Sequence, residues 1–76
     1  MTEEKWRAIK QMLGYRVITL RIESGLSQEE LADRAGISRA NVSHVERGHH
    51  APNLATLVCI ARGLGITANE LIEGIC

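Results

Sequence analysis

Glycines divide the chain at regular intervals, and each of five follows a segment in which apolar residues recur every three or four positions. A glycine in that place supplies the left-handed backbone that commonly ends a helix. The residues concerned are Gly25, Gly36, Gly48, Gly65 and Gly74. A chain punctuated in this way predicts short helices joined by tight turns, with no strand.

Polar residues mark where four of the helices begin. Two of them precede a glutamate by three positions, which is the capping-box pattern in which two side chains satisfy amide donors reciprocally. These pairs are Ser27 with Glu30 and Thr67 with Glu70, and the single N-cap candidates are Ser38 and Asn53, the latter directly after Pro52. Five helices are therefore predicted, over residues 2–23, 28–35, 39–47, 54–64 and 68–73.

The apolar residues of these helices predict one small core. The first helix carries a single apolar stripe, which Gly14 weakens slightly. The stripe is Trp6, Ile9, Leu13, Val17 and Leu20, and the last two helices turn inward Leu54, Leu57, Ile60, Ala61, Leu64, Leu71 and Ile72. The core is aliphatic because the chain has one Trp, one Tyr and no Phe. We expect one all-α domain over residues 1–76, with residues 1–12 as a helical extension.

Composition excludes several classes of protein. The two cysteines, Cys59 and Cys76, are too few for a disulfide framework, which indicates a reducing compartment. The chain begins with charged residues, and no stretch approaches the ~20 apolar residues that a membrane span needs. We therefore expect a cytoplasmic, nucleoid-associated protein that is neither exported nor embedded in a membrane.

The charges are balanced in number but uneven in position. The net charge is formally zero, which argues weakly against a nucleic-acid partner. However, residues 5–22 hold five basic residues and no acidic one, and residues 38–50 hold two arginines and three histidines against Glu46 alone. Acidic residues gather at 29–33 and 70–73. This distribution predicts a basic face and an acidic face, although ordinary solvated charge produces the same counts.

The segment 28–47 carries the pattern of a helix-turn-helix. Ala32 is small enough for two helices to cross closely, and Gly36 permits the positive backbone angle of a sharp turn. Val42 and Val45 then face the core, which leaves a polar surface on the other side of the third helix: Arg39, Ala40, Asn41, Ser43, His44 and Arg47. A helix braced in this way suits reading of the DNA major groove, although an ordinary helical bundle with a polar face has the same periodicity.

Four segments resemble successive blocks of the Cro and lambda-repressor-like helix-turn-helix regulators, the XRE family: LGYRVITLR, GLSQEELADRAGISRANVSHVERG, NLATLVCIARGLGIT and NELI. The resemblance implies a compact five-helix DNA-binding domain whose second and third helices form the helix-turn-helix. It also implies a pair between Arg21 and Glu46, which taken alone is a surface ion pair worth under ~1 kcal/mol. The size and organisation are also similar to restriction-modification controller proteins.

The resemblance assigns roles to the polar residues of this segment. The base-reading candidates are Arg39, Ala40, Asn41, Ser43 and His44, and the phosphate-contacting candidates are Gln28, Ser38, Arg47, Arg21 and His49. The chemistry agrees, because arginine can make a bidentate contact to guanine, asparagine can bind adenine, and alanine can contact a thymine methyl group. His49 and His50 stand where basic residues are frequent in the family, which makes phosphate attraction there weaker and more dependent on pH.

Metal and enzyme chemistry are not expected. The three histidines invite a metal site, but His44 lies a helical turn away from His49 and His50, and no cysteine or acid stands at ligand spacing. The chain lacks a set of nucleophile, base and orienting group, and it has no glycine-rich phosphate loop. We expect no cofactor, no metal and no small-molecule ligand.

The expected partners are double-stranded DNA and a second copy of the chain, since one reading helix makes too few base contacts for a regulator. The predicted dimer interface is Val58, Cys59, Arg62, Ile72 and Ile75. The alternative function is an antitoxin-type module that covers a protein partner and also binds its own promoter. Trp6 is available to such a partner, but we expect it to fold over the core of its own domain.

Overall fold

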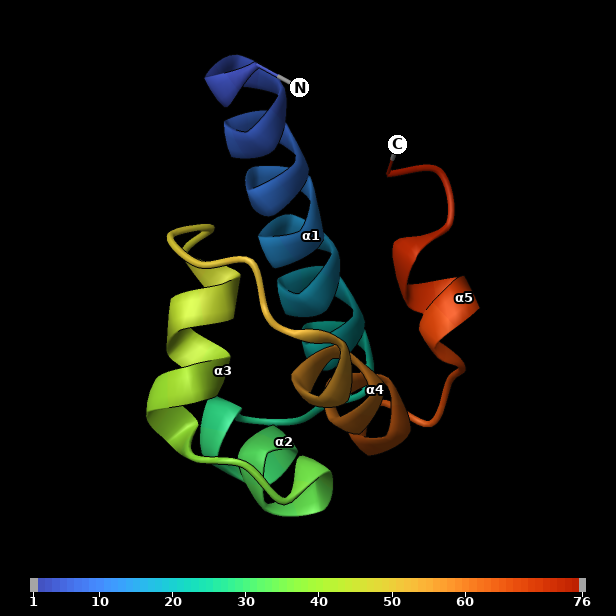
Figure 1. Cartoon of the computed structure of the whole chain (residues 1–76). Helices are drawn as coiled ribbons and strands as arrows, with labels where there is room; N and C mark the ends of the chain where they lie inside the picture. The colour runs from blue at the N-terminus through green and yellow to red at the C-terminus, as the bar shows by residue number, and fades with distance from the viewer. Residues whose placement is uncertain (1, 76) are drawn as a thin grey trace.

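The computed structural model describes residues 2–75, and every regular element in that range is a helix (Figure 1). The helices are α1 (Glu3–Glu23), α2 (Gln28–Ala35), α3 (Arg39–Glu46), α4 (Leu54–Gly63) and α5 (Ala68–Ile72). The all-α, five-helix prediction is confirmed. Four predicted ends move by one residue because Thr2, Arg47, Leu64 and Glu73 are caps outside the helices. Cys76 lies outside the described residues.

The helix ends follow the predicted capping signals. Both capping boxes are formed, and the Ser38 and Asn53 side chains accept hydrogen bonds from the backbone amides of Asn41 and Thr56 at 3.1 and 2.8 Å. In the first box, hydrogen bonds from the backbone and side chain of Ser27 lower the pKa of the Glu30 carboxyl. All five predicted glycines have positive φ, between 72° and 77°.

All five helices contribute to one aliphatic core. The long helix α1 runs down the middle of the molecule in Figure 1, with α3 on one side of it, α5 on the other, and α2 and α4 near its lower end. The buried cluster consists of Leu13, Val17, Leu31, Ala32, Val42, Val45, Ile60, Ala61, Leu71 and Ile75. None of the helices within residues 2–75 is long and apolar enough to cross a membrane.

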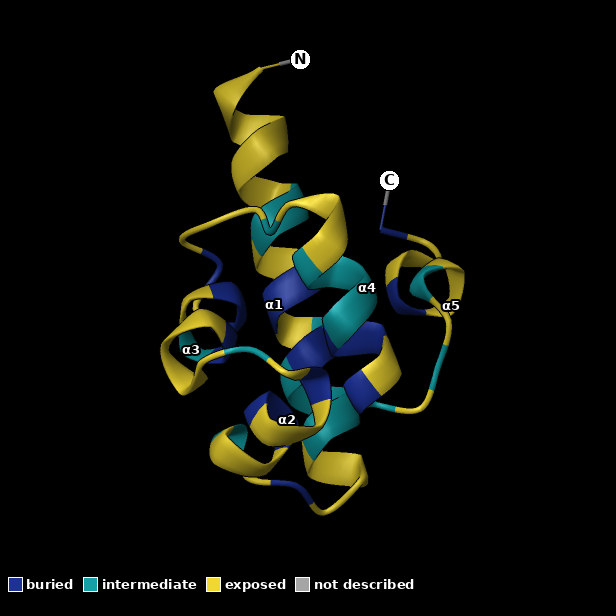
Figure 2. Ribbon diagram, turned by 60° about the horizontal axis from the view of Figure 1, so that its bottom comes forward, coloured by how far each residue is buried: buried dark blue, intermediate teal, exposed yellow. Residues whose placement is uncertain are grey.

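Three residues expected in the core are exposed. Trp6 is 48% exposed because the first turns of α1 project beyond the other helices, which Figure 2 shows as an exposed end of the ribbon. Leu54 is 74% exposed at the first position of α4, and Ile72 is 42% exposed at the last position of α5. Ile75, beyond α5, is buried instead.

Two glycines allow α1 and the end of α3 to approach closely. Gly14 is buried, and a Cβ atom there would lie 2.6 Å from the carbonyl oxygens of both Val45 and Glu46. After α3, a Cβ on Gly48 would lie 3.1 Å from the Cα of Gln11. The prediction that Gly14 only weakens α1 was therefore incomplete, because its missing side chain is what lets α3 pack against α1.

Candidate nucleic-acid interface

The second and third helices are joined by a turn that fixes their relative orientation. Gly36 ends α2 with a left-handed φ of 72°, and the amide of Ile37 donates to the carbonyl oxygen of Ala32 at 3.1 Å. Ser38 then caps α3, which has only eight residues and therefore depends on packing for its stability. Val42 and Val45 supply that packing, since they are 0% and 4% exposed.

The opposite side of α3 faces solvent. Four of the five base-reading candidates are exposed, and Ser43 is half-buried beside the core: the exposed set is Arg39, Ala40, Asn41 and His44. Among the phosphate-contacting candidates, Ser38, Arg47 and His49 are exposed. These seven exposed residues define what we call the α3 face. It carries long polar side chains on a helix that the rest of the domain holds in place.

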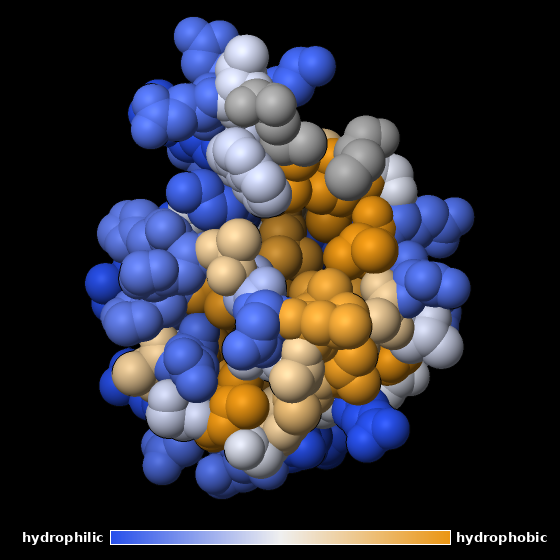
Figure 3. Space-filling view, in the orientation of Figure 1, coloured by the Kyte–Doolittle hydropathy of each residue, from blue (hydrophilic) through white to orange (hydrophobic). Residues whose placement is uncertain are grey.

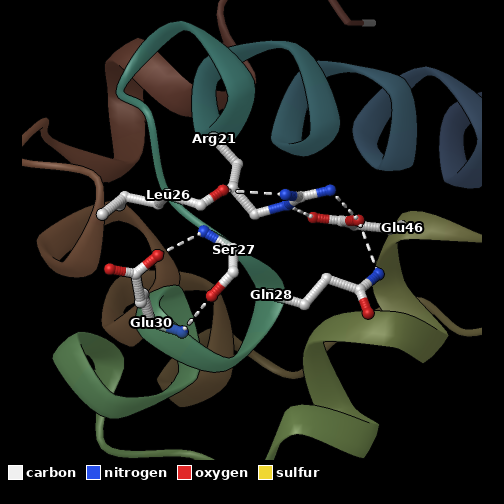
Figure 4. Close-up of polar contacts among 6 residues, drawn as sticks. All are labelled: Arg21, Leu26, Ser27, Gln28, Glu30 and Glu46. Atoms are coloured by element: carbon white, nitrogen blue, oxygen red, sulfur yellow. Dashed lines mark hydrogen bonds and ion pairs between the residues drawn. The ribbon is translucent and has the colours of Figure 1, made fainter.

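A buried carboxylate ties α3 to the two preceding helices (Figure 4). The Glu46 side chain is 3% exposed, and its Oε2 atom accepts from Arg21 Nε at 2.7 Å. Its Oε1 atom accepts from Arg21 Nη2 at 3.2 Å and from Gln28 Nε2 at 2.9 Å. Arg21 Nη1 also donates to the Leu26 carbonyl oxygen at 2.8 Å. Glu46 thus has three donors from α1 and α2, and we call this set the Glu46 network.

Comparisons with known proteins agree with this geometry. The helix-turn-helix family matches residues 17–71. The chain is 38% identical over 64 residues to the uncharacterized HTH-type transcriptional regulator y4dJ of Sinorhizobium fredii, which covers 84% of this chain and 83% of that protein. The chain belongs to the helix-turn-helix family. In the XRE-type members that it resembles, this segment is the DNA-binding unit of transcriptional regulators, which are not enzymes.

Two further relatives differ in how much of their own length the match covers. The chain is 35% identical over 60 residues to the immunity repressor protein of Bacillus phage phi105, but this alignment spans only 42% of that protein. The crystal structure of the restriction-modification controller protein C.AhdI from Aeromonas hydrophila matches with a TM-score of 0.78 and 39% identity. That match covers 82% of this chain and 94% of the controller protein.

Two of the candidate phosphate contacts are already engaged within the protein. Arg21 and Gln28 are half-buried, and their side chains donate to Glu46. The predicted Arg21–Glu46 pair is formed, but its interpretation as a surface pair was wrong because the carboxylate is buried. Gln28 keeps a second possible contact, since it is the first residue of α2 and its backbone amide has no acceptor within the helix.

Arg16 has a structural role that the sequence did not reveal. Its guanidinium donates to the carbonyl oxygens of Glu70, Leu71 and Glu73 at 3.4, 3.2 and 2.9 Å, and so it closes the carboxyl end of α5. The run of five basic residues in α1 is therefore not one DNA-facing surface. No signal in the sequence predicted this contact, because Gly74 already marked the end of the last helix and the three acceptors are backbone carbonyls.

Two of the three histidines, His44 and His50, lie side by side. The rings of His44 and His50 are 5.2 Å apart between centroids, at an interplanar angle of 47°. The chain turns at Gly48, after α3, and this brings His50 back beside His44. Within residues 2–75, no third histidine, cysteine or acidic side chain joins them in a metal-binding group.

The predicted dimer interface is mixed in exposure. Arg62 and Ile72 are exposed, and Val58 and Cys59 of α4 are half-buried. Ile75 is 5% exposed and packs in the core of its own protomer, so it has little surface to offer a second copy.

Proposed function

We propose that this protein is a sequence-specific transcriptional regulator that binds a two-fold-symmetric DNA operator as a homodimer. The observation that carries the proposal is the α3 face, in which exposed Arg39, Asn41 and His44 stand opposite buried Val42 and Val45. The major groove, ~12 Å wide, admits one α-helix, and its base edges offer donors and acceptors to such side chains. The names of the relatives as transcriptional regulators support the same function.

The start of α3 suits a phosphate as well as bases. The Ser38 side chain accepts a hydrogen bond from the amide of Asn41. The amides of the first turn carry the partial positive charge of a helix N-terminus. Arg39, Ala40 and Asn41 follow directly and are exposed, so a helix that enters the groove by this end presents them to base edges. Arg47 and His49 at the other end then lie near the sugar-phosphate backbone.

Two copies are needed because a single short helix contacts few base pairs. Specific regulators bind tightly by joining two half-sites about one helical turn apart. The proposed contact between copies uses Val58, Cys59, Arg62 and Ile72 of α4 and α5, because these residues combine partly exposed apolar atoms with an exposed charge.

Replacing Arg39 or Asn41 with alanine is expected to remove sequence discrimination. Each variant should lose about 1–3 kcal/mol per half-site on the preferred sequence and much less on scrambled DNA, because base-edge contacts exist only on the correct site. The preferred sequence comes from selection out of random DNA. Titration of each variant against the selected and the scrambled duplex then measures the loss.

Arg47→Ala is the matched control, because it removes an exposed arginine that is proposed to contact phosphate. It should weaken binding to both duplexes nearly equally. Gln28→Ala is less suitable, since it also removes a donor from the buried Glu46 carboxylate. If Arg39→Ala and Asn41→Ala keep their discrimination and their circular dichroism, α3 does not read the bases.

Binding is expected to depend strongly on salt although the net charge is zero. Roughly six to ten phosphate contacts per dimer predict that log K falls against log salt with a slope of roughly −5 to −9. The measurement is a titration of the selected duplex at several salt concentrations. A slope near zero would contradict the DNA interface and favour a protein partner as the main target.

A further inference from the structure

The first turns of α1 form an ordered projection. The Thr2 side chain caps the helix by accepting a hydrogen bond from the Lys5 amide at 3.2 Å. Glu3 and Glu4 lie in the first turn, where negative side chains interact favourably with the helix dipole. All residues from 2 to 8 are nevertheless exposed, and Trp6 is among them. A large indole group on a capped but uncovered helix is costly in water, so this projection calls for a covering surface.

An apolar groove lies directly beside this projection. Its volume is about 220 Å³, and it is lined by Ile9, Leu13, Ala51, Pro52, Leu57, Ile72 and Ile75. In Figure 3 hydrophobic side chains gather on this side of the molecule, between α1 and α5. The exposed part of Ile72 stands at the edge of the groove, so the groove continues into the α4–α5 surface proposed as the dimer contact.

Trp6 and the groove share one face of α1, but Trp6 does not line the groove of its own protomer. Trp6, Ile9 and Leu13 follow at intervals of three and four, so they line one stripe. Helical side chains lean toward the helix N-terminus, which tilts Trp6 away from the groove that begins at Ile9. In a dimer with a two-fold axis, each protomer supplies the same surface to the contact. The Trp6 projection of each copy can therefore enter the groove of the other.

The charges of α1 favour the same arrangement. Within the first two turns and the start of the groove, acidic residues come first, at Glu3 and Glu4, and the basic residues Lys5, Arg7 and Lys10 follow. When two copies of α1 cross in antiparallel fashion, the acidic first turn of one lies toward Lys10 of the other. Such exposed pairs contribute little to affinity. They set the orientation, while the apolar contact supplies the attraction.

We propose that the groove binds Trp6 of a second copy, and that the two copies exchange Trp6 reciprocally. This inference rests on the proposed homodimer and adds a second contact to it. A tryptophan buries about 150–250 Å², whereas a stable interface buries about 1,200–2,000 Å². Two exchanged tryptophans therefore reinforce the α4–α5 contact and do not replace it.

The test uses the fact that Trp6 is the only tryptophan, so its fluorescence reports this site alone. As the protein concentration rises through the monomer–dimer transition followed by sedimentation, the emission of Trp6 should move to shorter wavelength. Trp6→Ala should raise the dimer Kd at least about 100-fold, or tenfold for each of the two side chains. Tyr15→Ala is the matched control, because Tyr15 is an exposed aromatic residue of α1 that does not line the groove, and the dimer Kd should not change.

A second variant tests the groove itself without altering Trp6. Ala51 is exposed in the loop before α4, so Ala51→Glu places a charge at the edge of the groove with little risk to folding. It should weaken the dimer and keep the Trp6 emission of the monomer at concentrations where the wild type has shifted. If the protein dimerises while the Trp6 emission stays constant, the exchange is wrong and the homodimer stands. A protein that stays monomeric at tens of micromolar and on its selected DNA contradicts the homodimer itself.

Discussion

Replacing Glu46 with alanine is expected to lower the free energy of unfolding by about 3 kcal/mol. Removal of one partner from a buried ion pair costs about 3–5 kcal/mol, because the remaining charge stays buried without compensation. The lower end applies here because the Arg21 side chain keeps 15% of its surface exposed and can regain some water. Gln28 also loses its acceptor. For a domain of this size the whole stability is only about 4–11 kcal/mol, so the loss is a large part of it.

Thermal and denaturant unfolding followed by circular dichroism measure this effect. A domain of 60–100 residues loses about 4–8 °C in Tm per kcal/mol, which predicts a decrease of roughly 12–24 °C. Glu23→Ala removes an exposed carboxylate and should change the free energy by no more than about 0.5 kcal/mol. The double variant Arg21→Met, Glu46→Leu should recover much of this loss, because neither charge is then left alone, although the Gln28 amide still lacks its acceptor. If Glu46→Ala behaves like Glu23→Ala, the Glu46 network does not stabilise the domain.

Local signals in the sequence predicted most of the fold. A capping box acts between residues three positions apart, so Ser27 with Glu30 can be recognised without knowledge of the tertiary structure. The same holds for Gly36, whose positive φ depends on its own missing side chain. The helical spacing of Val42 and Val45 then separated the buried side of α3 from the exposed side. The α3 face was predictable because it required only these local rules.

Contacts between parts of the chain that are distant in sequence were harder to predict. Gln28 and Glu46 are 18 positions apart, and the resemblance to a family suggested only the pair with Arg21. Trp6 was misassigned because tryptophan is usually buried, but α1 is longer than the helices that pack against it. The exposure of Trp6 depends on where those helices end, and the apolar stripe of α1 gives no information about that. Arg16 was missed for the same reason, since its acceptors lie more than 50 residues away.

Gly14→Ala is expected to lower the free energy of unfolding by about 2 kcal/mol net, although the same change usually stabilises a helix. Alanine is favoured over glycine by about 1 kcal/mol in an exposed helix interior. At Gly14, however, the new Cβ atom would lie 2.6 Å from two carbonyl oxygens of α3, and backbone atoms cannot move aside as a flexible side chain can. Overpacking of this kind costs about 1–3 kcal/mol or more, and the contact with rigid backbone places Gly14 at the upper end.

The matched control reverses the substitution in the exposed part of the same helix. Ala8→Gly should cost about 1 kcal/mol through helix propensity alone, since Ala8 is exposed on the projection of α1. Denaturant unfolding of both variants separates the two effects, because propensity alone makes Gly14→Ala stabilising and close packing makes it destabilising. The displaced α3 should also carry the Glu46 carboxylate away from Arg21, so Gly14→Ala should make Glu46→Ala less costly than it is in the wild type. A stabilised Gly14→Ala variant would show that α1 and α3 do not approach at this glycine.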